Sequence, residues 1–256
     1  IGDDIQKQDP KGVNTSNKYW ELWNLVFIQN NRTKSGELED LPLKHVDTGA
    51  GLERIAAVLQ GKSSNYDTDL FYPIIESIQE IASSSYEKNP VPHRVIADHI
   101  RMLSFSIGDG ALPSNDGRGY VIRRILRRAS RYGKSIGIEG PFLYKLAGTV
   151  SDIMRDVYPE VQEKLSHIEK VIRSEEESFN IALGRGLIHF ENVIQSTSGN
   201  IISGSDAFKL YDTYGFPLDL TELMAKEKKM RVDEEGFKIS MKRQKEKAKR
   251  SRKFKN

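Results

Sequence analysis

Residues able to do chemistry are densest in the stretch VDTGAGLER, residues 46–54. An extended segment is predicted to end at Val46, and the spacing of apolar residues predicts an amphipathic helix over Leu52–Leu59. Glycine lets the backbone approach a ligand closely, and the start of a helix presents free N–H groups to an anion. Asp47 can receive an ammonium group and Arg54 can hold a phosphate. The junction therefore suits an amino acid and ATP, although a lone Gly-x-Gly is also typical of a simple tight turn.

A carboxamide, Asn24, lies within the apolar run Trp23-Asn24-Leu25-Val26. The alternation over residues 19–30 predicts a strand. Its period of two places Leu22, Asn24, Val26 and Ile28 on one face, and Trp23, Leu25 and Phe27 on the other. If Asn24 is buried, its amide needs hydrogen-bond partners. We consider two interpretations: Asn24 bonds a neighbouring loop, or it donates to the carboxylate of a small ligand whose side chain is limited by Val26.

A polar loop, residues 111–120, leads into a helix with a stripe of basic side chains. At about 100° per residue these side chains fall within one arc: Arg123, Arg124, Arg127, Arg128, Arg131 and Lys134. The residues between Gly117 and Lys134 include no acid, so the stripe is predicted to be uncompensated and to bind a phosphate backbone. The loop would then bring Asn115 to a base edge. Alternatively, Asn115 or Asp116 caps the helix.

A second acidic candidate, Asp212, lies in the aromatic turn FKLYDTYGFP, residues 208–217. The turn is also typical of a helix C-terminus with Gly215 as its left-handed residue. An acid is unfavourable at that end of a helix dipole. A hydrogen bond accepted from a base amino group would explain its presence.

Four segments in order carry a family resemblance: ELWNLVFIQNNR (21–32), VDTGAGLERIAAVLQG (46–61), ADHIRMLSFSIGDGALPSNDGRGYVIRRILRRASRYG (97–133) and FKLYDTYGFPLDLT (208–221). The chain resembles the alanyl-tRNA synthetases, a family of class II aminoacyl-tRNA synthetases, in their bacterial form. The resemblance implies ligation of alanine to its tRNA with ATP and Mg²⁺.

The resemblance also implies site roles. VDTGAGLER resembles the class II motif 3, in which Asp47 would bind the alanine ammonium, Gly49 would lie beside the substrate, and Gly51 and the catalytic Arg54 would bind ATP. Asn24 and Val26 match positions that contact the alanine carboxylate and methyl. Asn115 and Asp212 match the pair that reads a G·U wobble pair in the acceptor stem of alanine tRNA. The remaining predicted tRNA contacts are Arg118, Arg123, Arg124, Arg127, Arg128 and Arg131.

Several parts of that family have no counterpart in this sequence. No segment resembles motif 1 or motif 2, the zinc-bearing editing domain or the C-terminal oligomerisation domain, so no zinc or other bound metal is expected here. The chain begins at Ile1 without Met, which also suggests a fragment. Alone it is expected to bind tRNA but not to activate alanine. The alternatives are a non-catalytic acceptor-stem RNA-binding module and, less well supported by the arginine stripe, an enzyme resembling biotin ligases.

Composition limits the remaining classes. The 256 residues are 29% charged, without cysteine, and without an apolar run of the roughly 20 residues that span a membrane. No basic-then-apolar leader is visible, so a cytoplasmic protein without membrane partners is expected. The five histidines show no close pairing typical of a zinc site. Residues 237–256 carry ten Lys or Arg and one acid, which leaves residues 1–236 with a net charge of −6. This basic tail is either a solvated helix end or a contact for nucleic acid.

The predicted fold is α+β. Residues 1–63 are predicted to be the C-terminal part of an antiparallel-sheet catalytic domain, with a loop over 1–16 and a hairpin connection over 30–40. Residues 64–256 are predicted to form a mostly helical tRNA-recognition domain. Its helices are expected at 70–83, 93–107, 119–136, 141–157, 160–194, 205–211 and 218–226, with a basic helix from about Asp233.

Overall fold

The computed structural model describes residues 9–13, 15–16, 19–216 and 218–253, without the side chains of Ala182, Lys245 and 247–253. The chain divides into two compact units, 1–73 and 74–256, whereas the sequence predicted a division after residue 63. The α+β fold class is confirmed. Of the predicted N-terminal loop, residues 1–8 and 14 lie outside the described residues. The described part contains a short 3-10 helix, η2 (Pro10–Gly12), which Asp9 caps by accepting from Lys11 N at 3.0 Å.

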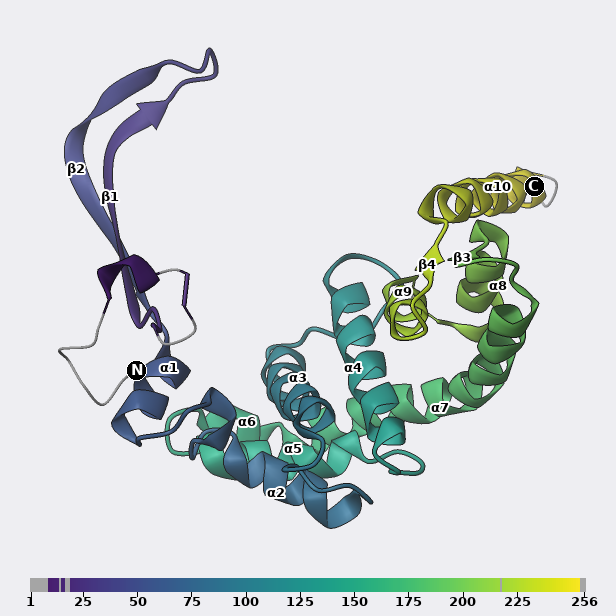
Figure 1. Ribbon diagram of the computed structural model, residues 1–256, viewed down its shortest axis with the longest axis horizontal. Helices are drawn as coiled ribbons and strands as arrows, with labels where there is room; N and C mark the ends of the chain where they lie inside the picture. The colour runs from purple at the N-terminus through teal and green to yellow at the C-terminus, as the bar shows by residue number, and fades with distance from the viewer. Residues whose placement is uncertain (1–8, 14, 17–18, 217, 254–256) are drawn as a thin grey trace. The chain divides into compact units, whose positions relative to one another are not determined.

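The first unit contains a long antiparallel hairpin of β1 (Trp23–Arg32) and β2 (Leu38–Ala50), visible in Figure 1. The predicted hairpin is confirmed, and its turn places Gly36 at a φ of 92°. Both strands differ from the prediction at their ends. β1 begins at Trp23 rather than at residue 19, and β2 continues to Ala50 rather than ending near Val46. Backbone pairing explains the second difference, because Thr48 and Gly49 still have partners on β1.

The apolar side chains of this hairpin are exposed on both faces. Trp23 is 63% and Phe27 is 68% exposed, and they lie on the face opposite to Val26, which is also exposed. Asn24 is exposed too, so the condition of burial, under which its amide needs protein partners, is not met. Alternation defines which side chains share a face of a strand, and it does not define what covers that face.

Helix α1 (Leu52–Leu59) begins directly after β2. Gly51 occupies the N-cap, and its N–H donates to Leu22 O at 3.0 Å, which continues the backbone ladder up to the helix. The helix ends at Gln60, followed by Gly61 with a φ of 63°. The predicted helix is therefore confirmed. The short 3-10 helix η3 (Asn65–Asp67) contacts α1.

The second unit is helical and close to the sequence prediction (Figure 1). Its helices are α2 (Tyr72–Ile81, whose buried face Ile74, Ile75 and Ile78 belongs here), α3 (Pro90–Gly108), α4 (Gly117–Ser135), α5 (Leu143–Met154), α6 (Pro159–Glu163), α7 (Leu165–Ser196), α8 (Gly204–Tyr214), α9 (Leu218–Glu227) and α10 (Glu234–Lys253).

Two features of this unit differ from the prediction. The single helix predicted over 160–194 is interrupted at Lys164, which ends α6 and precedes α7. The Lys164 ammonium donates to Gly108 O at 2.7 Å, a tertiary contact that sequence periodicity does not reveal. A parallel pair of short strands, β3 (Ile201–Ile202) and β4 (Arg231–Val232), was not predicted, since each has only two residues.

The unit buries its apolar faces in two regions. Helix α3 contacts α4, α5 and α7, and its residues Ile96, Ile100 and Leu103 are fully buried. A second cluster joins the C-terminal half of α7 to α8 and α9, with Phe179 and Phe216 at its centre. These regions hold the arginine face of α4 beside α7, α8 and α9. Within the described part of the chain, no helix has the length and apolarity needed to cross a membrane, and no three acidic or histidine side chains are grouped to bind a metal.

Candidate active site and nucleic-acid interface

The four predicted alanine-binding residues share one face of the hairpin. Asn24 pairs with Gly49, and Val26 pairs with Asp47, in the antiparallel register. Residues two apart on one strand and directly opposite residues on its neighbour point to the same side. A Cβ built on Gly49 would have no atom within 4 Å, so the glycine leaves open space on this face. The face therefore offers a carboxylate and a carboxamide beside open space at Gly49.

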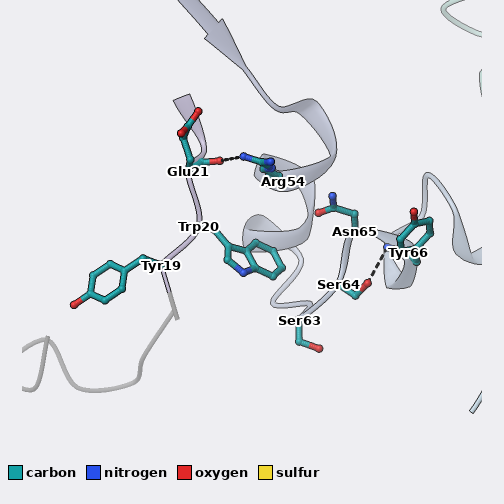
Figure 2. A pocket seen from close by; sticks show the side chains of 8 residues that line it. All are labelled: Tyr19, Trp20, Glu21, Arg54, Ser63, Ser64, Asn65 and Tyr66. Carbon is teal, nitrogen blue, oxygen red and sulfur yellow. Dashed lines mark hydrogen bonds between the residues drawn. The ribbon is translucent and has the colours of Figure 1, made fainter. Parts of the chain in front are cut away.

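Arg54, in the first turn of α1, lines a cavity of about 490 Å³ within the first unit. Figure 2 shows its guanidinium directed to the main chain of Glu21, where Nη1 donates to the carbonyl oxygen at 2.7 Å. Trp20 and Tyr66 line the same cavity. The absence of a side chain at Gly51 leaves room for Arg54, because a Cβ on Gly51 would lie 3.2 Å from Arg54 Cδ. A cation, aromatic rings and a helix N-terminus together suit a nucleotide.

Glu21 contacts two of the predicted site residues, and sequence reasoning missed it. Its carbonyl holds Arg54, and its carboxylate accepts from Asn24 Nδ2 at 3.4 Å. One residue thus connects the predicted alanine-binding face to the predicted ATP-binding arginine. Its position within the predicted strand gave no signal of this, because the contact to Arg54 joins residues 33 apart in sequence.

Asn115 and Asp212 line one cavity of about 380 Å³ in the second unit, together with Tyr120, Tyr211 and Gln244. Asp116 occupies the N-cap of α4 without a side-chain capping bond. The Asn115 amide oxygen instead accepts from Arg123 Nη1. The Asp212 carboxylate accepts from Gln244 Nε2 of α10, a partner that sequence reasoning missed. Gly215 ends α8 with a φ of 67°, so the predicted helix C-terminus is confirmed.

The predicted arginine stripe lies on α4, but the expectation that it is uncompensated is wrong. Acids from other helices pair with it. Glu175 of α7 lies 3.0 Å from Arg123 Nε and 2.9 Å from Arg127 Nη2. The acids on α9 continue the pattern, with Asp219 Oδ2 3.4 Å from Arg124 Nε and Glu227 paired with Arg131. Scanning residues 117–134 alone could not reveal acids 40 or more positions away.

The arginines nevertheless differ in how far their side chains are exposed to solvent. Arg118 and Arg124 are exposed, whereas Arg123, Arg127 and Arg131 are partly buried in ion pairs. Arg128 is also partly buried, and among the residues that the structure describes its Nε has no hydrogen-bond partner. A cavity of about 230 Å³ is lined by Arg124, Arg127, Arg128, Asp219, Leu220 and Leu223. Burial raises the pKa of the Asp219 carboxyl there, against the lowering effect of Arg124.

Comparison with known proteins places these sites in a family. A family model described as "tRNA synthetases class II (A)" matches residues 1–256. The chain therefore belongs to the class II tRNA synthetases. Among curated proteins, a protein named alanine–tRNA ligase from Chlorobium phaeobacteroides is 53% identical over 92% of this chain and 27% of its own length. A protein of the same name from Exiguobacterium sibiricum is 50% identical over 98% of this chain and 29% of its own length. The chain thus spans less than a third of the length of these relatives.

Proposed function

We propose that this chain carries the alanine-binding face and the tRNA-recognition unit of an alanine–tRNA ligase. The observation that carries the proposal is the strand register, which pairs Asn24 with Gly49 and Val26 with Asp47 on one face of the hairpin. The name shared by the relatives, alanine–tRNA ligase, supplies the amino acid and the reaction. The complete reaction is proposed for a longer protein, because the chain covers only part of those relatives.

On the hairpin face, the Asp47 carboxylate would pair with the ammonium of alanine, and Asn24 would donate to its carboxylate. Val26 would limit the space for the side chain, and open space at Gly49 would admit the substrate. The alanine carboxylate would attack the α-phosphate of ATP and release pyrophosphate. A terminal ribose hydroxyl of the tRNA would then attack the carbonyl carbon of the mixed anhydride and release AMP. Arg54, Gly51 and the N-terminus of α1 would bind phosphate oxygens. Mg²⁺ would accompany ATP and neutralise phosphate charge.

In the helical unit, the cavity between Asn115 and Asp212 would read the G·U pair of the acceptor stem. In a minor groove, guanine offers an amino donor and pyrimidines offer a carbonyl acceptor. The Asp212 carboxylate matches the amino donor, and the Asn115 amide nitrogen matches the carbonyl. The predicted phosphate contacts would flank this cavity, with exposed Arg118 and Arg124 the most accessible: Arg118, Arg123, Arg124, Arg127, Arg128 and Arg131.

A second candidate function is an acceptor-stem-binding module without catalysis. The observation that favours it is that the helical unit forms its cavity from residues 115–244, without any residue of the hairpin. ATP–pyrophosphate exchange with alanine separates the two functions. If the function is ligation, the longer protein should catalyse ATP–pyrophosphate exchange. If the chain is a binding module, RNA binding should be observed without any exchange.

Asp47→Asn in the longer enzyme tests the amino-acid site. Loss of one charge-assisted hydrogen bond, worth about 1.5–3 kcal/mol, should weaken alanine binding by roughly ten- to a hundredfold. ATP affinity should change far less. Asp40→Asn is the matched control, because Asp40 lies on the same strand but accepts from Asn30 Nδ2 at 2.6 Å instead. Equal losses for alanine and ATP would show that Asp47 has a structural role.

Asn115→Ala and Asp212→Ala test the recognition cavity. Each should reduce discrimination between G·U and G·C stems by about 1–3 kcal/mol. The double variant should lose less than the sum, because both residues would contact one base pair. Arg124→Ala should weaken both stems alike and reduce the salt dependence of binding. Titrations of this chain with both stems at several salt concentrations measure these effects. Equal weakening of both stems by Asn115→Ala and Asp212→Ala would contradict base reading.

A further inference from the structure

Glu175 on α7 lies at the meeting point of two chains of contacts that lead to the recognition cavity. Its side chain is only 11% exposed. Oε1 accepts from Arg127 Nε at 3.1 Å and from Arg127 Nη2 at 2.9 Å, a fork-like pairing that fixes the guanidinium plane. The same oxygen lies 3.0 Å from Arg123 Nε, at an angle that makes an ion pair rather than a hydrogen bond. One carboxylate therefore holds two guanidinium groups of α4.

The first chain of contacts leads to Asn115. With Arg123 fixed by Glu175, its Nη1 donates to the Asn115 amide oxygen. An amide whose oxygen is occupied by a donor has its nitrogen oriented the other way. The contact therefore determines which end of Asn115 is available as a donor in the cavity.

The second chain of contacts leads to the end of α8, which carries Asp212. Arg127 Nη1 donates to Gly215 O, and a Cβ on Gly215 would lie 3.2 Å from that nitrogen. The Arg127 guanidinium also lies 5.2 Å from the ring centre of Phe179, which holds it from the side of α7. The last turn of α8, and with it Asp212, is thereby fixed to α4.

Burial lowers the pKa of Arg127, Glu175 raises it, and Arg123 lowers it as a neighbouring like charge. Both guanidinium groups lie about 3 Å from the same carboxylate oxygen, so they repel each other. Without a carboxylate between them, at least one guanidinium would turn toward solvent and release its contact with Asn115 or Gly215. The acid is thus needed for both contacts at once.

We propose that Glu175 is a positioning residue that sets the placement of Asn115 and Asp212 across the cavity. That placement would favour a G·U pair, whose guanine amino group is not bonded to its partner base, over a G·C pair, whose guanine amino group donates to the cytosine carbonyl. This proposal rests on the proposed function of the cavity. It assigns no contact between Glu175 and RNA. Glu175 acts through Arg123 and Arg127.

The test measures binding of this chain to acceptor-stem duplexes with G·U or G·C at the recognised position. Glu175→Gln keeps the shape of the side chain but places an amide where a charge faced two arginines. Preference for G·U should fall by roughly tenfold, the size of one lost base contact, while affinity for G·C changes less than about threefold. Glu175→Asp, which keeps the negative charge, should retain part of the preference for G·U that Glu175→Gln loses. Glu177→Gln is the matched control, because Glu177 lies on the same helix and pairs with exposed Arg173 at 2.8 Å.

A double-mutant cycle distinguishes positioning from a general structural role. If Glu175 acts through the two reading residues, Glu175→Gln should cause no further loss of preference in a chain that already carries Asn115→Ala and Asp212→Ala. Should Glu175→Gln destabilise the fold, Arg123→Lys provides a second variant, since it keeps a positive charge but loses the guanidinium fork and should lower the preference alone.

The outcomes separate this proposal from the function on which it rests. If the unaltered chain shows no preference for G·U, the proposed recognition fails. If Asn115→Ala abolishes the preference while Glu175→Gln leaves it intact, recognition stands and the positioning role is wrong. Equal weakening of both stems by Glu175→Gln, together with a lower melting temperature, would also overturn the positioning role.

Discussion

Phe27 in the hairpin and Phe179 in the helical unit are the same residue type in opposite surroundings. Phe27 is 68% exposed, whereas Phe179 is fully buried. The hairpin has two strands joined to each other, and among its described residues no layer covers either face. The helical unit closes its own core from α3 to α9. The difference teaches that alternation alone leaves apolar surface exposed in the hairpin, whereas the helical unit buries its apolar side chains between its own helices.

The largest expected effect compares these two phenylalanines directly. Phe179→Ala should reduce the free energy of unfolding by about 3–5 kcal/mol, because it leaves a cavity in a packed cluster. Phe27→Ala should change it by less than about 0.5 kcal/mol, since an exposed ring loses little contact. Urea unfolding of this chain, followed by circular dichroism, measures both. A large effect of Phe27→Ala would show that the hairpin has a core of its own.

A second prediction concerns the pH dependence of the helical unit. Glu176 on α7 is buried and accepts from Leu143 N at 3.0 Å, at the start of α5. Burial raises the pKa of its carboxyl to about 7, against the lowering effect of the backbone donors at Phe142 and Leu143. The folded chain therefore retains a proton that the unfolded chain releases between about pH 4.5 and pH 7.

Because the folded chain binds more protons than the unfolded chain over this pH range, its free energy of unfolding falls as the pH rises. Stability contributed by the protonated Glu176 is present below about pH 4.5, decreases by on the order of 3 kcal/mol up to about pH 7, and is constant above it. Glu176→Gln should remove this decrease, so its stability relative to the unaltered chain should rise between pH 4.5 and pH 8. Denaturant unfolding at several pH values measures it, with the exposed neighbour Glu177→Gln as control. A constant difference between Glu176→Gln and the unaltered chain would contradict the prediction.

The comparison of the two units also shows what a sequence can predict. Local patterns predicted the hairpin, α1 and most helices of the second unit, because alternation, apolar spacing and glycines act within a few residues. The break at Lys164 was missed, and the contact that Lys164 makes there is with Gly108, 56 residues away, which no local pattern reveals. The predicted elements were therefore confirmed where neighbouring residues in the sequence determine the structure.

The candidate sites follow the same rule. The sequence predicted Asn24 on one strand and Asp47 just past the end of another, and the register places both within the paired hairpin. It could not show that Glu175 neutralises two arginines, since 48 residues separate it from Arg127. Nor could it show that Gln244 holds Asp212, across 32 residues. Residue types identified candidates, and tertiary contacts decided their partners.

The smallest expected effect compares one hydroxyl in each unit. Ser203 caps α8 by accepting from Asp206 N at 3.1 Å, within an S-x-x-D pattern typical of a helix start. Thr48 accepts from Trp23 Nε1 at 2.5 Å on an exposed face of the hairpin. Ser203→Ala should cost about 1 kcal/mol, because the cap satisfies a backbone donor of a helix that belongs to the core.

Thr48→Val should change the free energy of unfolding by less than about 0.5 kcal/mol, since water replaces the lost partner and valine is favoured in strands. Thermal unfolding of the two variants at one pH, monitored by helical circular dichroism, gives the comparison. Backbone hydrogen exchange in β1 and β2 then checks the hairpin itself. If Thr48→Val costs as much as Ser203→Ala in the unfolding of the helices, the hairpin contributes to the folding of the helical unit and the two units are not independent.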